Sequence, residues 1–169
     1  MNRAHDDVDE ILAAWRRERP DLDVAPLEVL SRVSRLARRL DLARGSAFSE
    51  QDLEGWAFDV LSALRRAGAP YELSPGQLVQ QTLVTSGTMT NRVDRLERRG
   101  LVERRPDPGD RRGVLVRLTD TGREVVDQAM AELIVQEKSM LTDLSTGDQR
   151  DLAALLRRLL APLEARDPA

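Results

Sequence analysis

A single interruption in an otherwise helical pattern of apolar residues constrains the fold of this 169-residue chain more than any other feature. Two short runs typical of β-strands lie at residues 101–105 (LVERR) and 114–118 (VLVRL). The segment between them, residues 106–113 (PDPGDRRG), is rich in residues that favour turns. The two runs therefore predict a β-hairpin, and we expect a mainly α-helical fold that carries this one small hairpin.

Apolar residues elsewhere recur every three or four positions, the spacing that gathers them on one face of a helix. Serine and threonine residues mark the expected helix starts, because their side-chain oxygens accept hydrogen bonds from the first backbone N–H groups. The expected N-caps are Ser49, Ser74, Thr85 or Ser86, Thr119 and Ser145. Helices are accordingly expected at residues 5–18, 26–47 and 49–67, after Ser74, and at 85–100, 119–141 and 145–163.

The order of these elements places a short helix, a turn and a second helix directly before the hairpin. This is the order of a winged helix-turn-helix, in which the second helix enters the major groove of DNA and the hairpin forms the wing. A chain of this length suits one compact domain, so residues 1–169 are expected to form a single domain.

The two faces of the expected helix at 85–100 support this interpretation. Met89, Val93 and Leu96 cluster on one side, and polar side chains lie nearly opposite. Asparagine can read adenine and arginine can read guanine, while small hydroxyl side chains reach phosphates or a thymine methyl group. The expected DNA-binding residues of this helix are Thr85, Ser86, Thr88, Thr90, Asn91, Arg95 and Arg98. The alternative is that this polar face is only solvated.

The hairpin adds a second basic element. Its tip contains Arg111 and Arg112, whose guanidinium groups suit phosphate or minor-groove contacts. Residues 89–117 carry nine arginines against five acidic residues, so a chain with net charge -3 contains a locally basic segment. The alternative is a local salt bridge that fixes the turn, and we expect Asp110 to play this part while an arginine reaches DNA.

Composition excludes several other classes of function. The chain has no cysteine and one histidine, His5, so no zinc cluster, metal site, disulfide or thiol chemistry is expected. It has no glycine-rich phosphate loop and no nucleophile beside a base, so neither enzyme activity nor a cofactor is expected. An acidic amino terminus and the lack of a long apolar run predict a cytoplasmic protein with no membrane partner.

Residues 85–122 resemble the recognition helix and wing of the MarR family, in which the string D-R-R-x-x-x-x-x-L-T-x-x-G is specific for the wing. The resemblance implies a homodimeric, repressor-type regulator, with residues 1–48 and 119–165 forming interlocked dimerisation helices and 49–118 the DNA-binding region. It also implies that Arg112 enters the minor groove. Leucine-rich faces on the terminal helices give an independent reason for dimerisation, unless those faces pack within one chain.

Within the family, the extra amino-terminal helix and the segments 18–24 and 58–66 are similar to the urate-responsive branch. This resemblance implies a ligand site formed by Trp15, Asp59, Arg66 and Arg92. A purine anion would pair with the guanidinium groups and stack on the tryptophan, and Arg92 is expected to turn inward toward Asp59. The alternatives are that Trp15 belongs to an interface and that Asp59 forms a structural salt bridge with Arg66 or Arg92. Trp56, on the core face of its helix, is expected to serve packing.

Two functions are therefore weighed. The first is a sequence-specific regulator that binds a pseudo-palindromic site in double-stranded DNA and is released by a small anion such as urate. The second is a winged-helix module that binds DNA or protein and has no small-molecule effector.

Overall fold

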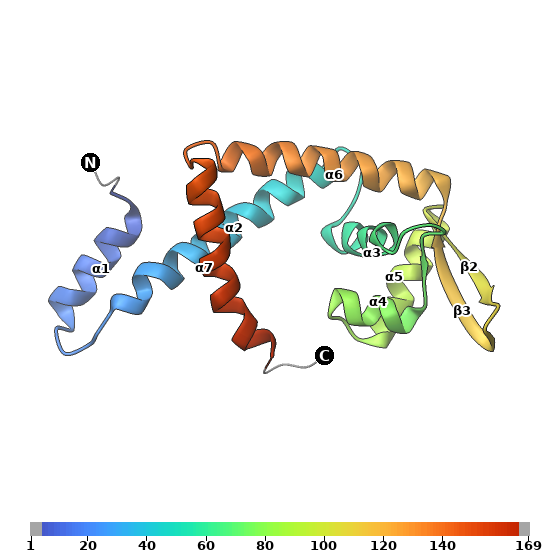
Figure 1. The fold of residues 1–169 in the computed structure, drawn as a ribbon, viewed down its shortest axis with the longest axis horizontal. Coiled ribbons are helices and arrows are strands. Elements are labelled where there is room, and N and C mark those ends of the chain that lie inside the picture. Colours follow the sequence, from blue (N-terminus) through green and yellow to red (C-terminus); the bar gives the residue numbers. More distant parts are fainter. Residues whose placement is uncertain (1–4, 166–169) are drawn as a thin grey trace. The chain divides into compact units, whose positions relative to one another are not determined.

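A computed structural model describes residues 5–165, and the chain divides into two compact units, Met1–Ala43 and Arg44–Ala169. The first unit contains helix α1 (Asp7–Glu18) and most of helix α2 (Ala25–Ser49), which continues into the second unit (Figure 1). The second contains α3 (Gly55–Arg66), β1 (Glu72–Leu73), α4 (Pro75–Thr82), α5 (Ser86–Arg98), β2 (Val102–Asp107), β3 (Asp110–Leu118), α6 (Asp120–Met140) and α7 (Thr146–Glu164). This order confirms the expected mainly α fold with a small hairpin. Among residues 5–165, no helix is long and apolar enough to cross a membrane.

The first unit has a small core and several ion pairs. Val8 and Leu12 of α1 pack with Val24, and Leu27 adds to this cluster. Around it, three arginines pair with carboxylates of the opposite helix or of its N-cap, Asp6: Arg16 with Glu28, Arg32 with Asp6 and Asp9, and Arg35 with Asp7. A core this small leaves the attachment of α1 to α2 dependent on charge as well as on apolar contact.

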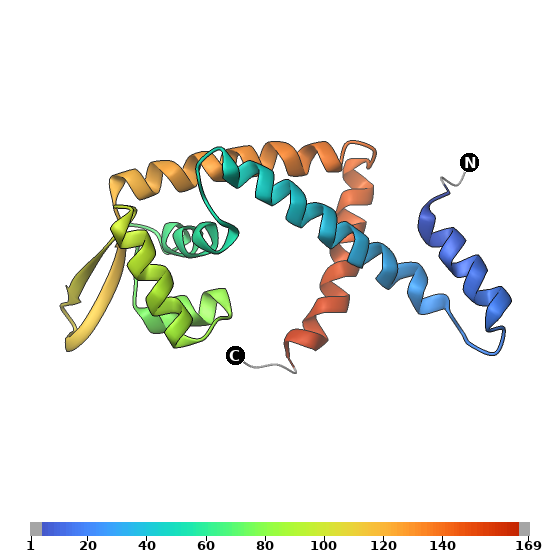
Figure 2. The same ribbon diagram turned by 180° about the vertical axis from the view of Figure 1, so that it is seen from behind.

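The second unit has the main core. Residues of α3 are buried along most of the helix and pack with the apolar faces of α4, α5 and α6 and with the sheet. Figure 2 shows α4 and α5 beside the β2–β3 hairpin, which extends away from the helices of this unit. The hairpin is therefore attached at its base and projects at its tip.

The sheet is antiparallel with the strand order β1-β3-β2. Strand β2 pairs with β3 from Val102 opposite Leu118, and β1 adds a short edge with Glu72 opposite Arg117. The hairpin was expected from the sequence, although its strands are longer than the two apolar runs. Strand β1 was not expected, because two residues are too few to show an alternating pattern.

One expected helix start is wrong. Ser49 is the last residue of α2, and its hydroxyl donates to the backbone carbonyl of Ser46 at 2.7 Å instead of capping the next helix. Helix α3 begins at Gly55, after a loop in which Asp52 has a φ of 51°. Burial of Phe48 against Phe58, whose ring lies 4.3 Å away, accompanies the continuation of α2 past residue 47.

Candidate nucleic-acid interface

Helices α4 and α5 form a helix-turn-helix whose boundaries follow from local chemistry. Ser74 and Gln77 form a capping box at the start of α4, and Pro75 occupies its first turn. Leu83 ends α4 in the left-handed conformation, and Thr85 caps α5 by accepting from the N–H of Thr88. Ser74 and Thr85 are thus confirmed as N-caps.

The buried face of α5 holds the helix against the core. Met89, Val93 and Leu96 are each at most 2% exposed, as the helical spacing predicted. Helix α5 packs against α3, α4 and β2 through this face. The opposite face of the helix is therefore available for a partner.

Every DNA-binding residue expected on α5 is exposed. Some of the hydroxyl groups make local hydrogen bonds: the Oγ1 atoms of Thr85 and Thr88 lie 2.9 Å apart, and Thr90 donates to the carbonyl of Ser86. The exposed set comprises Thr85, Ser86, Thr88, Thr90, Asn91, Arg95 and Arg98. The face is polar, carries small side chains at its amino-terminal end, and can present hydrogen-bond donors to a groove.

The turn of the β2–β3 hairpin is built by two aspartates. Asp107 accepts a hydrogen bond from the N–H of Gly109, and Asp110 accepts one from the N–H of Arg112 at 2.9 Å. A Cβ atom on Gly113 would lie 2.8 Å from the Cβ of Asp107, so the turn needs glycine there. Asp110 therefore shapes the turn through a backbone N–H rather than through the expected salt bridge.

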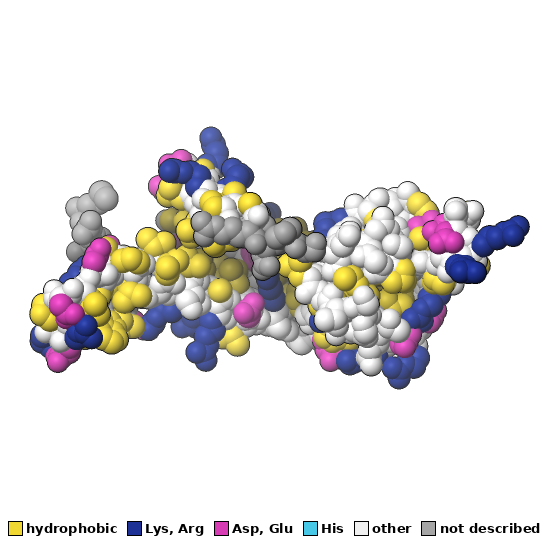
Figure 3. All heavy atoms as spheres, turned by 90° about the horizontal axis from the view of Figure 1, so that it is seen from below, with side chains coloured by type: hydrophobic (Ala, Val, Ile, Leu, Met, Phe, Trp, Pro, Cys, Tyr) yellow, Lys and Arg dark blue, Asp and Glu magenta, His cyan; other side chains and the backbone are white. Residues whose placement is uncertain are grey.

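The two arginines at the hairpin tip are exposed. Within residues 5–165, neither the Arg111 nor the Arg112 guanidinium has a carboxylate within ion-pair distance. In Figure 3, lysine and arginine side chains (dark blue) project from the end of the molecule where the hairpin lies. These donors are consequently free to bind an anionic partner.

A brace between the hairpin and α5 was not foreseen from the sequence. Arg104 of β2 is paired with Asp94 and with Glu97, both on α5, and its backbone N–H donates to Glu97 Oε1 at 3.0 Å. The three side chains are partly buried or exposed at the junction of the two elements. This arrangement fixes the base of the hairpin to the helix that presents the polar face.

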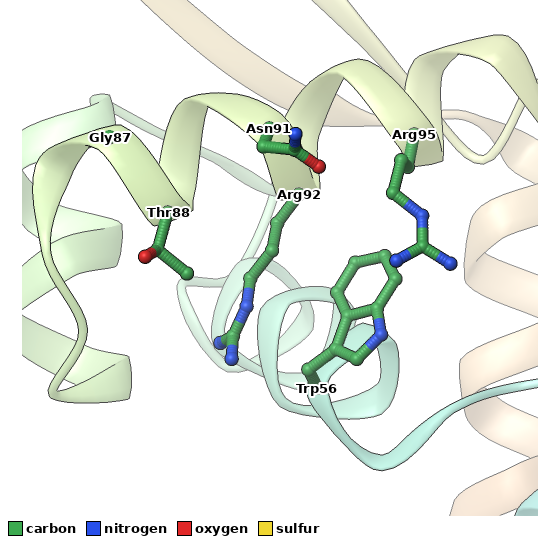
Figure 4. Close-up of a pocket in the computed structure, with 6 residues that line it drawn as sticks. All are labelled: Trp56, Gly87, Thr88, Asn91, Arg92 and Arg95. Carbon is green, nitrogen blue, oxygen red and sulfur yellow. The ribbon is translucent and has the colours of Figure 1, made fainter.

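Trp56 forms the floor of a cavity of about 390 Å³ on the same side of α5. As Figure 4 shows, Arg92 and Arg95 extend from α5 toward this indole of α3, with guanidinium carbons 5.7 and 4.6 Å from the ring centroid. Gly87, Thr88 and Asn91 complete the lining. Trp56 packs partly against the core, as expected, but it also holds two arginines by cation–π contact, which its apolar position alone did not reveal.

The loop before α3 provides further contacts to α5. The carboxylate of Glu54 accepts from Arg95 Nη2 at 2.8 Å, and the backbone carbonyl of Asp52 accepts from Arg99 Nη2 at 2.7 Å. Arg95, expected on the outward reading face, is exposed as predicted, and it also contacts Glu54 and Trp56.

The residues expected to bind a ligand come from both units. Trp15 lies on α1 in the first unit and is 46% exposed. In the second unit, Asp59 and Arg66 are exposed on α3, and Arg92 is half-buried on α5. Across the described part of the chain, no ion pair or hydrogen bond joins Asp59 to either arginine. The inward direction of Arg92 is as expected, but its contact is Trp56 rather than Asp59.

Comparison with known proteins places these features in a family. The MarR family model matches residues 51–113, which cover α3 to the hairpin tip. The chain is 40% identical over 153 residues to the HTH-type transcriptional regulator PecS of Dickeya dadantii, covering 90% of this chain and 92% of the relative. It is also 32% identical to the HTH-type transcriptional repressor NicR of Pseudomonas putida, covering 82% and 89% of the two chains.

Solved structures give the same result. The fold matches a MarR variant from Escherichia coli complexed with operator DNA, with a TM-score of 0.69 and 29% identity over 81% of this chain and 95% of that one. It also matches BpsR of Bordetella bronchiseptica, whose DNA binding is regulated by 6-hydroxynicotinic acid, with a TM-score of 0.60 and 29% identity over 76% and 93%.

Proposed function

Because this chain belongs to the MarR family and is a DNA-binding transcriptional regulator, we propose that it represses a promoter as a homodimer on a pseudo-palindromic site. In this proposal α5 of each subunit enters a major groove and the two grooves are roughly one helical turn apart. The hairpin tip contacts the adjacent minor groove or backbone. The observation that carries the proposal is an exposed polar face on α5, together with a braced hairpin whose tip carries Arg111 and Arg112, for which residues 5–165 provide no carboxylate partner.

The proposed contacts divide into two kinds. Asn91, Arg95 and Arg98 would read base edges, whereas Arg111, Arg112 and the hydroxyl side chains at the start of α5 would hold the backbone and the minor groove. Base contacts give sequence discrimination, while phosphate contacts contribute affinity on any duplex and depend on salt. This division makes the two kinds of contact separable by experiment.

The test compares binding to the chain's own promoter fragment with binding to a random duplex at physiological salt. Asn91→Ala should lower the ratio of the two affinities, because a base contact is worth about 1–3 kcal/mol of discrimination. Arg112→Ala should weaken binding to both duplexes. Arg38→Ala, an exposed arginine of α2 outside the proposed interface, is the matched control. Wild-type affinity in both interface variants would rule out this docking.

We also propose that a small planar anion releases the protein from DNA, with urate or a related purine as the first candidate and Trp15, Asp59, Arg66 and Arg92 as its site. The support is that Arg92, one of these four residues, lines an open cavity together with the Trp56 ring and the Arg95 guanidinium, groups that suit a planar anion. The regulation of BpsR by 6-hydroxynicotinic acid shows that a similar protein responds to a small aromatic acid. A ligand acts this way only if it binds the free protein more tightly than the DNA-bound protein.

Titration of the protein–DNA complex tests this proposal. Urate and 6-hydroxynicotinate should each be added to complexes of the wild type, Trp15→Phe, Asp59→Asn and Arg92→Gln proteins. Release of the wild type with a higher half-effective concentration in the variants supports the site. Release that is absent, or equal in all four proteins, favours the second function, a winged-helix module that binds DNA or protein without an effector.

A further inference from the structure

Arg95 is the one residue of the proposed reading face whose guanidinium the described structure holds against both a carboxylate and an aromatic ring. Its Nη2 lies 2.8 Å from Glu54 Oε2, and its guanidinium carbon lies 4.6 Å from the centroid of Trp56. Arg98, on the same face, has as its one partner within residues 5–165 the carbonyl of Asp94 in its own helix. The DNA-reading arginines are therefore not equivalent before DNA is bound.

Within residues 5–165, the Glu54 carboxylate has no partner other than Arg95, although the backbone carbonyl of Glu54 accepts the first hydrogen bonds of α3. It occupies the N-cap position of α3, where serine, threonine, aspartate and asparagine are preferred, but its side chain makes no capping hydrogen bond. The carboxylate is instead directed to Arg95 on the neighbouring helix. The Glu54 side chain therefore contacts the proposed reading face of α5.

A guanidinium that reads guanine needs two donors in one plane directed at the base. The pair with Glu54 uses one of the terminal nitrogens of Arg95, and stacking on Trp56 fixes the plane of the group against the protein. The side chains of Arg95 and Glu54 are 45% and 52% exposed, so water reaches the pair and the arginine can leave it. An exposed ion pair of this kind contributes at most about a fivefold change in an equilibrium constant.

We infer that Glu54 and Trp56 form a latch that holds Arg95 in the free protein and competes with DNA for it. Binding then requires the Arg95 guanidinium to exchange Glu54 for an acceptor on DNA. Glu54 therefore lowers affinity for a site at which Arg95 must leave it, and so it sets how much base reading by Arg95 contributes to recognition without itself touching DNA. This inference rests on the proposed function, in which α5 reads the DNA.

The first experiment is a double-mutant cycle on the promoter fragment at fixed salt. Glu54→Gln keeps the side-chain shape and removes the charge, and should tighten binding about two- to fivefold. The same substitution in an Arg95→Ala background should not tighten binding, because the Glu54–Arg95 ion pair is already absent there. Glu50→Gln, with the same loss of charge four positions earlier and no ion pair within residues 5–165, controls for general repulsion of phosphate.

A second measurement follows the latch directly. The chain has two tryptophans, so ¹⁹F NMR of 5-fluorotryptophan-labelled protein gives two resonances, and Trp56→Phe identifies that of Trp56. Adding promoter DNA should shift the Trp56 resonance in the wild type as Arg95 leaves the ring. The shift should be much smaller in Arg95→Ala.

The outcomes separate the latch from the function on which it rests. Specific promoter binding combined with an Arg95-dependent gain in Glu54→Gln and a shifted Trp56 resonance supports the latch. Four results overturn the latch alone when the wild type still binds the promoter specifically. Glu54→Gln could tighten binding equally in the Arg95→Ala background, or Glu50→Gln could tighten it as much as Glu54→Gln does. Glu54→Gln could instead weaken binding, or the Trp56 resonance could stay unmoved when DNA is added. Equal binding of the wild type to promoter and random duplex overturns the proposed function and the latch together.

Discussion

Gly122 lies where the hairpin meets α6, and there is no room for a larger side chain at that point. A Cβ atom at this position would lie 1.9 Å from the backbone carbonyl oxygen of Leu101. Thr119 completes the junction, because its hydroxyl donates to the carbonyl of Gly100 at 2.7 Å and accepts from the N–H of Gly122. The L-T-x-x-G end of the family string is therefore a helix cap followed by a close approach of two backbones.

We predict that Gly122→Ala lowers the free energy of unfolding by about 1–3 kcal/mol, the range for overpacking a filled site. The reason is that backbone atoms, and not a flexible side chain, must move to make room. The free energy of unfolding, measured by urea denaturation, gives the change. Gly87→Ala is the control, since a Cβ atom there meets nothing within 4 Å and alanine favours a helix over glycine. Equal stability of the two variants would contradict the close approach.

At the level of single residues, the sequence predicts what depends on near neighbours. Ser74, Thr119 and Ser145 cap their helices as expected, because the capping partner lies three residues ahead. The prediction that Ser49 is an N-cap was wrong, because α2 continues through Ser49 while Phe48 is buried in the core. The contact between Arg95 and Glu54 joins residues 41 positions apart, and no local pattern contains it.

At the level of elements, Arg104 links the hairpin to α5. It pairs with Asp94 and Glu97 of α5 from its place on β2. Core packing of Val102, Val116 and Leu118 anchors the base of the hairpin, and the ion pairs of Arg104 tie β2 to α5 in addition. We therefore regard Arg104 as a positioning residue for the arginines at the hairpin tip.

We predict that Arg104→Gln weakens binding to the promoter about three- to tenfold, or about 0.7–1.4 kcal/mol. This is less than the contribution of a hydrogen bond to a charged group, about 1.5–3 kcal/mol, because only the positioning of the tip arginines is lost. Arg105→Gln is a matched control, because it removes the same charge one position later from an arginine that pairs with Glu103 of its own strand. Fluorescence anisotropy with a labelled promoter fragment measures both affinities. If both variants lose the same affinity, the effect is one of charge and not of position.

The attachment of α1 to α2 should depend on pH. Arg32 donates to Asp6 at 2.8 Å and lowers the pKa of that carboxyl below its ordinary value of 3.8. For Asp9 the backbone N–H of Asp6 is the main cause of a lowered pKa, and the hydrogen bond from Arg32 adds to it. Because the folded-state pKa values are depressed, these pairs stabilise α1 above pH 3.8 and lose that effect as the pH falls through the folded-state values.

We predict that carboxyl ¹³C NMR titration gives midpoints below 3.8 for Asp6 and Asp9 in the wild type, and a higher midpoint for Asp6 in Arg32→Gln. The reason is that the carboxylate form loses its charged donor. Arg19→Gln is the control, because this arginine pairs with Asp21 and not with the two titrated groups. An unchanged Asp6 midpoint in Arg32→Gln would show that the ion pair does not form in solution.

Elements differ in how far the sequence predicts them. The hairpin and the helices at residues 7–18, 86–98 and 146–164 follow from periodicity and capping. Strand β1 forms because Glu72 and Leu73 pair with Arg117 and Val116 of β3, which lie more than forty residues later in the sequence. The brace from Arg104 likewise requires β2 and α5 to be packed together, and the sequence alone showed only charged residues there.

At the level of the whole molecule, α7 carries an apolar face that the chain leaves uncovered. Leu155, Leu159 and Leu163 are 58%, 41% and 55% exposed, and no residue of α7 whose side chain is described is buried. Figure 3 likewise shows exposed hydrophobic side chains (yellow) over α1 and α2. Within the second unit, the described residues of α7 do not bury their leucine face, and an exposed apolar face of this kind is typical of an interface.

We predict that the wild type has twice the 18.9 kDa mass of one chain in solution, and that Leu159→Glu shifts it toward the monomer. A carboxylate placed on the apolar face of α7 would be buried without a partner in a dimer, whereas it is solvated in the monomer. Sedimentation equilibrium at several protein concentrations measures the dissociation constant, which we expect to rise at least tenfold.

Ala154→Glu is the matched control, because residue 154 is exposed nearly opposite Leu159 around α7 and the same charge there should leave the dimer intact. Circular dichroism must show equal helix content in the two variants, so that loss of the dimer is not loss of the fold. Since a pseudo-palindrome is bound by two recognition helices held at a fixed separation, Leu159→Glu should also lose promoter affinity while Ala154→Glu keeps it. A wild-type monomer that still bound the promoter specifically would contradict the dimer and leave the reading face of α5 as the sole basis of recognition.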